Sequence, residues 1–319
     1  MFEMLNWLLM ILPFALWGTA MAAMSPLVAS GGPEIVASLR LFPAGIVVLL
    51  TLLIIKRSLL INKSDLFWFF VFTLVDGTLF QFLLARGLQE TGAGLGSVFI
   101  DSQPLIVALL SRSLFGDAIN PIGWIGLIIG LVGIVCLGVS PDFLSHWFLM
   151  GVDASNSKLL SQGEGWMLGA AISMAFGTVL IRFACKNSDP VAVTGWHMIL
   201  GSLPLIVWHC FDSNWPLLPT WSNAEWVLMA YSSLFGSALA YGLFFWFANK
   251  KELTSFSTLA FLTPVFALLS GGFWLGERLE FLQWVGVLVV LLSVFLVSQR
   301  HRLWEPFKKD ENIVQGEII

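Results

Sequence analysis

Long apolar stretches separated by short polar breaks occupy most of the chain. Each stretch has roughly the 20 residues that an α-helix needs to cross a bilayer, and the breaks carry Gly, Pro, Asn, Asp, Lys or Arg, which favour turns. We therefore predict an all-α integral membrane protein with ten transmembrane helices. Only the junction over residues 140–164 is long. The expected spans are residues 5–24, 34–55, 66–85, 94–113, 121–139, 165–182, 190–210, 225–247, 256–275 and 280–298.

The composition supports lipid as the solvent. Of the 319 residues, 57% are hydrophobic and 11% are charged, whereas soluble domains have about 25% charged residues. The formal net charge is -4 and nothing resembles a basic surface, so no nucleic-acid partner is expected. Cys136, Cys185 and Cys210 show no paired spacing. We therefore expect no disulfide framework, no metal site and no cofactor.

Lys and Arg are unevenly distributed over the expected loops, and this bias predicts the orientation. With the amino terminus in the cytoplasm, twelve of the 16 Lys and Arg residues lie inside, three lie outside, and Arg40 lies within a span. Both termini are therefore expected to be cytoplasmic. The outside residues are Arg86, Lys158 and Arg278, and the inside residues are Lys56, Arg57, Lys63, Arg112, Arg182, Lys186, Lys250, Lys251, Arg300, Arg302, Lys308 and Lys309.

Two stretches repeat the same landmarks 160 residues apart. Such self-similarity indicates a duplicated unit. We predict two five-helix repeats, residues 1–140 and 165–299, joined by an outside linker over 141–164 and followed by a cytoplasmic tail over 300–319. The matched landmarks are Pro104 and Pro264, Gly116 and Gly276, Asp117 and Glu277, Trp124 and Trp284, and Gly126 and Gly286.

A unit of five spans leaves the membrane on the side opposite to its entry, so the second copy should be inverted. The charges agree, because the loop after the second span contains Lys56, Arg57 and Lys63, while its counterpart over 211–224 contains no Lys or Arg. Inverted repeats are the usual basis for alternating access. Pro104 and Pro264 occupy matched places within expected helices and are candidate hinges.

The run from Ser237 to Gly286 reads SALAYGLFFWFANKKELTSFSTLAFLTPVFALLSGGFWLGERLEFLQWVG. It closely resembles the second repeat of EamA-type members of the drug/metabolite transporter superfamily. The opening ALWGTAMAAMSPLV with PEIVASLRLFPAG resembles the first repeat. The resemblance covers about residues 5–298. The shared landmarks are fairly specific for the family and say little about substrate.

The resemblance implies a ten-helix carrier with a central cavity lined by helices 1–4 and 6–9, and with helices 5 and 10 packed outside. Family members export or exchange amino acids, other small metabolites and drugs. The expected partners are therefore the lipid bilayer and a small-molecule substrate, in a bacterial cytoplasmic (inner) membrane. Many relatives carry Lys shortly after the Trp-Gly of helix 1, where this chain has Ser25; any function of that Lys must be performed otherwise here.

Three ionisable side chains, Arg40, Asp76 and Asp101, lie within expected spans. Each costs roughly 2.5–3.5 kcal/mol at a helix centre, and such residues often have a function. One hypothesis is that Arg40 binds a substrate carboxylate through forked hydrogen bonds, while Asp76 or Asp101 binds an ammonium group or carries a coupling proton. An α-amino acid would satisfy both charges. The alternative is a permanent Arg40–Asp101 pair that fixes helix packing.

The second copy lacks these acids, so we expect one polar wall and one more aromatic wall around the site. For His197 the alternative is a packing role, which is commoner for a lone helical histidine. On one continuous helix, Asp101 and Gln103 lie about 200° apart, so we expect only one of them to face the cavity wall. The remaining candidates for the substrate site are Trp17, Gln81, His197, Tyr241 and Trp246.

No catalytic motif accompanies these residues. The sequence contains no HExxH, no GxSxG and no Walker motif, so a secondary carrier is the leading prediction and enzymatic activity is not expected. An intramembrane enzyme is one alternative, and modification of a lipid or peptide without solute movement would favour it. A channel or non-transporting receptor is the other, and saturable counterflow would argue against it.

Overall fold

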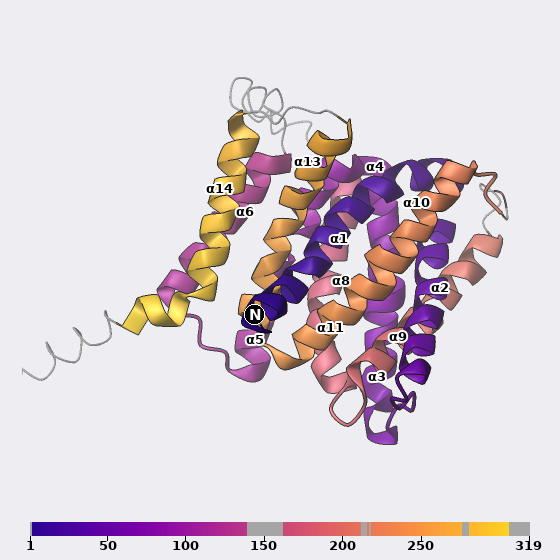
Figure 1. Ribbon diagram of the computed structural model, residues 1–319, viewed down its shortest axis with the longest axis horizontal. Coiled ribbons are helices and arrows are strands. Elements are labelled where there is room, and N and C mark those ends of the chain that lie inside the picture. The colour runs from indigo at the N-terminus through magenta and orange to yellow at the C-terminus, as the bar shows by residue number, and fades with distance from the viewer. Residues whose placement is uncertain (1, 139–161, 212–215, 217, 276–280, 306–319) are drawn as a thin grey trace, which may run out of the picture.

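The computed structural model describes residues 2–138, 162–211, 216, 218–275 and 281–305 (Figure 1). Within these residues all elements are helical and no strand occurs. Eight helical segments are long and apolar enough to cross a membrane, and two shorter apolar helices accompany them. An all-α membrane fold is thus confirmed, whereas the count of ten spans and the side of the termini stay predictions.

The described helices fall into two halves, before and after residues 139–161. The first half comprises α1 (Phe2–Gly31), α2 (Pro33–Ile54), η1 (Lys63–Asp65), α3 (Leu66–Phe72), η2 (Thr73–Phe80), α4 (Gln81–Ile100), α5 (Gln103–Phe115) and α6 (Pro121–Gly138). The second half comprises α8 (Gln162–Ala184), α9 (Pro190–Phe211), α10 (Asn223–Ser233), η3 (Leu234–Leu239), α11 (Ala240–Lys250), α12 (Leu253–Ser257), η4 (Thr258–Phe261), α13 (Leu262–Leu275) and α14 (Phe281–Ser298).

Helix α4 bends back on itself. Gly87 and Gly96 both lie against Met167 of α8, and Leu84 and Asp101 line one small cavity. On a straight helix, Leu84 and Asp101 would be about 25 Å apart at 1.5 Å per residue. The chain was expected to reverse direction between the spans 66–85 and 94–113. This reversal occurs within α4, and it brings Asp101 back close to Leu84.

Helices of the two halves pack mainly against each other. The most extensive contacts join α2 to α9, α4 to α8 and α6 to α14. In Figure 1, α6 and α14 lie side by side at one end of the molecule. Their approach is close because Gly126 faces Val297 and Gly133 faces Val290, and Ser293 Oγ donates to the Gly126 carbonyl at 2.6 Å. The centre of the molecule is thus built from both halves.

The two halves depart from regular α-helix at matched places. The π-helical segments η2 and η3 coincide at a spacing of 160 residues, and a break at residues 101–102 corresponds to the 3₁₀ segment η4. Pro104 and Pro264 each lie in the first turn of the helix that follows, α5 or α13. This corrects the expected geometry of the hinges: each proline begins a helix, where its missing N–H is not needed, and the break precedes it.

The folded unit extends past the predicted boundary at residue 299. Arg300 is fully buried, its guanidinium pairs with Glu252, and it donates to Ser255 Oγ at 3.0 Å. Its backbone carbonyl accepts from Asn120 Nδ2 at 2.6 Å. Arg300 is therefore part of the helical body. Most of the expected linker, the landmarks over 276–280 and residues 306–319 lie outside the described residues.

Candidate functional site

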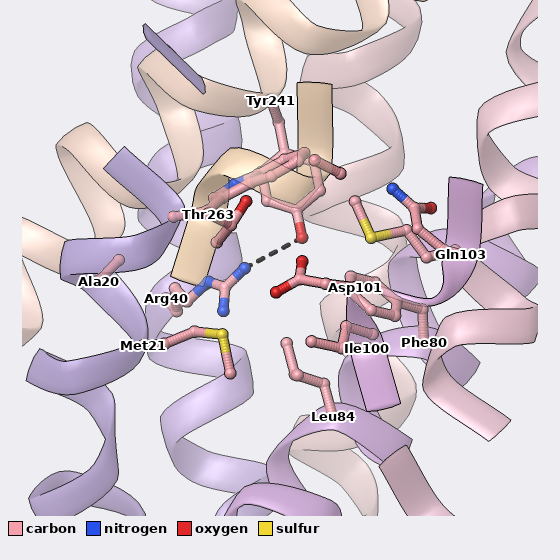
Figure 2. A pocket seen from close by; sticks show the side chains of 13 residues that line it. Ala20, Met21, Arg40, Phe80, Leu84, Ile100, Asp101, Gln103, Tyr241 and Thr263 are labelled. Carbon is pink, nitrogen blue, oxygen red and sulfur yellow. Dashed lines mark hydrogen bonds between the residues drawn. The ribbon is translucent and has the colours of Figure 1, made fainter. Parts of the chain in front are cut away.

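An internal cavity of about 40 Å³ lies between the two halves (Figure 2). It takes side chains from α1, α2, η2, α4, α5 and α8, and from α11, η4 and α13. A cavity needs about 10–15 Å³ to hold a water, so this one is large enough to be hydrated. Its lining consists of Trp17, Ala20, Met21, Arg40, Phe80, Leu84, Ile100, Asp101, Gln103, Met174, Tyr241, Ala260 and Thr263.

The Arg40 guanidinium is held by three neutral neighbours. Nε donates to Ser237 Oγ at 2.8 Å, and Nη2 donates to Tyr241 Oη at 3.0 Å. Nη1 donates to Met24 Sδ at 2.9 Å, and a thioether is a weak acceptor. Among the described residues, no carboxylate forms an ion pair with Arg40. The charge is thus fixed in orientation without an ion-paired carboxylate in the described part of the chain.

Tyr241 of α11 bonds to two side chains from different helices of the first half, Arg40 of α2 and Gln81 of α4. Its hydroxyl accepts from Arg40 Nη2 and also from Gln81 Nε2 at 2.8 Å. Trp17 Nε1 donates to the Gly236 carbonyl at 3.1 Å, and the Trp17 and Tyr241 rings lie edge to face at 5.1 Å. The structure therefore brings together four of the predicted site residues, although Gln81 stands behind the cavity lining rather than in it.

Asp101 and Gln103 both line the cavity, so the prediction from helical spacing was wrong. The chain leaves α-helical geometry at residues 101–102, and the period of 3.6 residues does not apply across that break. Figure 2 shows the Asp101 carboxylate pointing towards the Arg40 guanidinium and the Tyr241 hydroxyl. In the described structure, Asp101 Oδ2, both amide atoms of Gln103 and Thr263 Oγ1 have no hydrogen-bond partner. Buried polar atoms are normally paired, so such a cluster indicates a place for polar ligand groups.

Asp76 and His197 are paired with each other beside this cavity and are not part of its lining. Asp76 Oδ2 lies 3.2 Å from His197 Nε2, and both side chains are fully buried. His197 Nδ1 lies 2.6 Å from the Thr194 carbonyl oxygen. The His197 ring also lies 6.4 Å from the Tyr241 ring, centroid to centroid. Two predicted site residues thus form a separate buried pair that adjoins the Arg40 network.

Trp246 faces away from the central cavity, unlike its predicted placement. It lines a groove of about 490 Å³, here called the lateral groove. The Lys250 ammonium lies 4.1 Å from the Trp246 ring centroid. The lateral groove is lined by Asn6, Leu9, Val47, Val48, Thr51, Val191, Leu234, Ala238, Leu239, Gly242, Leu243, Trp246 and Phe247.

Sequence reasoning did not single out Ser237 and Met24, which hold Arg40. Ser237 is a hydroxyl in an otherwise apolar run, directly after the Gly236 that stands where the first copy has Asp76, and that contrast was the available signal. Met24 offered no signal because its side chain counts as apolar. In the part of the chain that the structure describes, no group of three or more His, Cys, Asp or Glu could hold a metal ion.

The profile of the EamA-like transporter family matches residues 4–139 and residues 161–299. The chain belongs to this family. This EamA-family protein is 50% identical over 318 residues to an uncharacterized transporter of Synechocystis sp., covering 98% of this chain and 95% of that relative. It is 43% identical over 298 residues to a WAT1-related chloroplastic protein of Arabidopsis thaliana, covering 92% and 69%. Family and relatives identify an integral membrane protein of the transporter class.

A solved crystal structure shares the fold of this EamA-family protein. It superposes with a TM-score of 0.74 and covers 92% of this chain and 98% of its own. The two sequences are 16% identical, so this likeness shows the fold alone.

Proposed function

We propose that this EamA-family protein is a secondary carrier that exports or exchanges amino acids or similar small amphipathic metabolites. One observation carries the proposal: an Arg40 guanidinium held by neutral groups shares a small cavity with an unpaired carboxylate oxygen of Asp101. An α-amino acid has a carboxylate and an ammonium group, which are complementary to these two charges.

The contacts of Arg40 support recognition of a carboxylate. Its weakest partner is Met24 Sδ on Nη1, so a carboxylate at that position would exchange a thioether for a charge-assisted hydrogen bond. The substrate ammonium would donate to Asp101 Oδ2, and Gln103 and Thr263 offer further polar atoms. The remaining wall is apolar and would contact the substrate side chain.

Substrate binding requires movement, because about 40 Å³ does not hold an amino acid. The site lies between the halves. Residues of η2, of the break at 101–102 and of η4 line it, and η3, the counterpart of η2, contacts Arg40 through Ser237. π-Helical segments are frequent at functional sites. We propose that the halves rock about these segments and open the site alternately to each side, and that the conformation described here is the closed one.

Counterflow in proteoliposomes across a panel of amino acids tests this function. We expect saturable counterflow for at least one amino acid, and about a 10- to 100-fold lower kcat/KM in Arg40→Ala and Asp101→Asn, because a hydrogen bond to a charged group contributes about 1.5–3 kcal/mol. Arg112→Ala, at an exposed arginine away from the cavity, is the control and should behave as wild type. Counterflow of no amino acid, or undiminished counterflow in Arg40→Ala, would refute the proposal.

We infer a bacterial cytoplasmic (inner) membrane as the location. The relative from Synechocystis sp. covers nearly the whole chain, whereas the Arabidopsis relative is chloroplastic. Fractionation of cells of the source organism, with inner-membrane and organelle marker proteins, distinguishes the two locations.

A further inference from the structure

The Asp76–His197 pair joins the two halves of the molecule. Asp76 belongs to the π-helical segment η2 of the first half, and His197 belongs to α9 of the second. Both side chains are fully buried, and Asp76 Oδ2 lies 3.2 Å from His197 Nε2. Movement between the halves would therefore alter this contact.

The Thr194 carbonyl determines which imidazole nitrogen carries a hydrogen. Nδ1 of His197 lies 2.6 Å from that oxygen, and a carbonyl can only accept, so Nδ1 is protonated. The other nitrogen, Nε2, faces Asp76 Oδ2. Two lone pairs cannot form a hydrogen bond, so one hydrogen lies between Nε2 and Oδ2. The pair is then either neutral imidazole with carboxylic acid or imidazolium with carboxylate, and both forms have the same proton count and zero net charge.

The packing around Asp76 leaves little room for another donor that could take the place of the shared proton. A β-carbon at Gly177 of α8 would lie 2.3 Å from Asp76 Oδ1, and one at Gly201 would lie 2.6 Å from the backbone of Gly77. Asp76 Oδ1 has no hydrogen-bond partner in the described structure. Loss of the shared proton in this closed conformation would leave a buried carboxylate facing a lone pair, which is strongly unfavourable.

Few other ionisable groups face the pair. From α2, the Arg40 guanidinium acts on Asp76 through space, and from α11 the Tyr241 ring lies 6.4 Å from the imidazole. The flanking rings are Phe72 of α3, 4.6 Å from the imidazole, and Phe245 of α11, 5.5 Å from it. Helix α3 contains no ionisable side chain, Arg86 of α4 pairs with Glu34, and Arg182 of α8 donates to the Ala248 and Lys251 carbonyls. Arg40, which lines the cavity, is thus the charged residue whose electrostatic interaction with Asp76 links the pair to the cavity.

We propose that Asp76 and His197 together bind the proton that this carrier couples to transport. The proposal rests on the carrier function above and assigns the coupling step to a pair outside the cavity. When the halves part, water accepts the shared proton, and a carboxylate and a neutral imidazole remain with a net charge of −1. That charge attracts Arg40 and competes with a substrate carboxylate, whereas the protonated pair does not. Proton and substrate therefore favour each other's binding, and the coupling is reciprocal. The two are then carried in the same direction, so of the two modes proposed above this coupling fits exchange and not export driven by an inward proton gradient.

Histidine ¹⁵N NMR of the full-length protein in detergent tests the shared proton directly. The chain has four histidines, and His197→Gln identifies the resonances of His197. We expect a protonated Nδ1 and an Nε2 resonance that moves in Asp76→Asn, while the other histidines keep their shifts and so report an intact fold. An unprotonated Nδ1, or an Nε2 resonance that Asp76→Asn leaves unmoved, overturns the proposal.

Counterflow at different pH values tests the coupling. For any amino acid that wild type moves, we expect KM to rise about tenfold between pH 5.5 and pH 8, and to lose this dependence in Asp76→Asn. Glu90→Gln, at an exposed carboxyl outside the pair and the cavity lining, is the matched control and should keep the wild-type dependence. The same pH dependence in Asp76→Asn as in wild type refutes the coupling role. If no amino acid moves, the carrier proposal fails, and the NMR result still decides whether the pair holds a proton.

Discussion

The buried Arg40 is tolerated in this protein because neutral groups accept its hydrogen bonds. Ser237 and Tyr241 accept from Arg40 at 2.8 and 3.0 Å, and the Tyr241 hydroxyl also accepts from Gln81. One hydroxyl group therefore satisfies two donors that come from different helices. Its removal would leave both donors unpaired in a buried place, which costs more than a hydrogen bond contributes when both partners are present.

Tyr241→Phe should lower both stability and transport. We expect a loss of about 1–3 kcal/mol in the free energy of unfolding, and weaker counterflow because Arg40 loses its orienting partner. Thermal unfolding in detergent and counterflow measure the two effects. The chain has two tyrosines, and the other, Tyr231, bonds Thr19 Oγ1 at 2.5 Å outside the cavity lining. Tyr231→Phe should therefore retain counterflow, and equal counterflow in Tyr241→Phe and wild type would contradict this role.

At the scale of the helices, glycines decide how closely neighbours approach. A β-carbon at Gly201 of α9 would lie 2.6 Å from backbone atoms of Gly77 in η2, and neither backbone can yield without moving its helix. Gly242 of α11 lines the lateral groove, and a β-carbon there would meet nothing within 4 Å. The same substitution should therefore have opposite effects at the two positions.

Gly201→Ala should destabilise the protein by about 1–3 kcal/mol, because overpacking forces the helices apart. Gly242→Ala should stabilise it by about 0.5–1 kcal/mol, because alanine is the better residue in a helix interior. Unfolding midpoints measured in one detergent compare the two variants with wild type. A shift of both midpoints in the same direction would show that helix propensity, and not close approach, governs these positions.

At the scale of the whole molecule, hydrogen bonds between described residues join the two halves at both ends. At the end predicted to be cytoplasmic, Asp65 accepts from the Asn187 backbone N–H at 2.8 Å and from Ser188 Oγ at 2.7 Å. At the opposite end, Ser30 Oγ of the first half donates to Glu225 at 3.4 Å and accepts from Trp221 Nε1 at 3.0 Å. Alternating access would require the Asp65 contacts to open during the cycle.

Cross-linking across the Asp65 end should stop transport. Ser64 Oγ accepts from Asn187 Nδ2 at 3.0 Å, so Ser64→Cys with Asn187→Cys places two thiols near each other. We expect a short, reducible thiol cross-linker to abolish counterflow and reduction to restore it, because the halves could then no longer part. Each single variant with the same reagent is the control, and full counterflow after complete cross-linking would contradict rocking.

Cys185, the buried native cysteine near Asp65, should interfere little with the cross-linking experiment. Burial, followed by the nearby Asp65 and Asp189 carboxylates, raises the pKa of the Cys185 thiol. The thiolate is the reactive form, so Cys185 should react slowly at neutral pH. The wild-type chain treated in parallel measures labelling at the exposed Cys210.

The sequence by itself determined the all-α membrane class, the family and most of the cavity's key side chains. Apolar runs of membrane length permit only helices or closed barrels, and these properties are written locally along the chain. Arg40, Asp101, Trp17 and Tyr241 could be chosen because polar and aromatic side chains within such runs are few. The inverted arrangement and the orientation stay predictions, since they depend on the membrane side of each loop.

Only the tertiary structure decided which side chains meet. Asp101 and Gln103 share one cavity because the helix breaks between them, and a period read from the sequence assumes no break. Asp76 meets His197 across 121 residues, while Trp246 turns to the lateral groove. Such partnerships depend on the rotation and crossing of packed helices, which are set by contacts between distant segments. No local pattern contains that information.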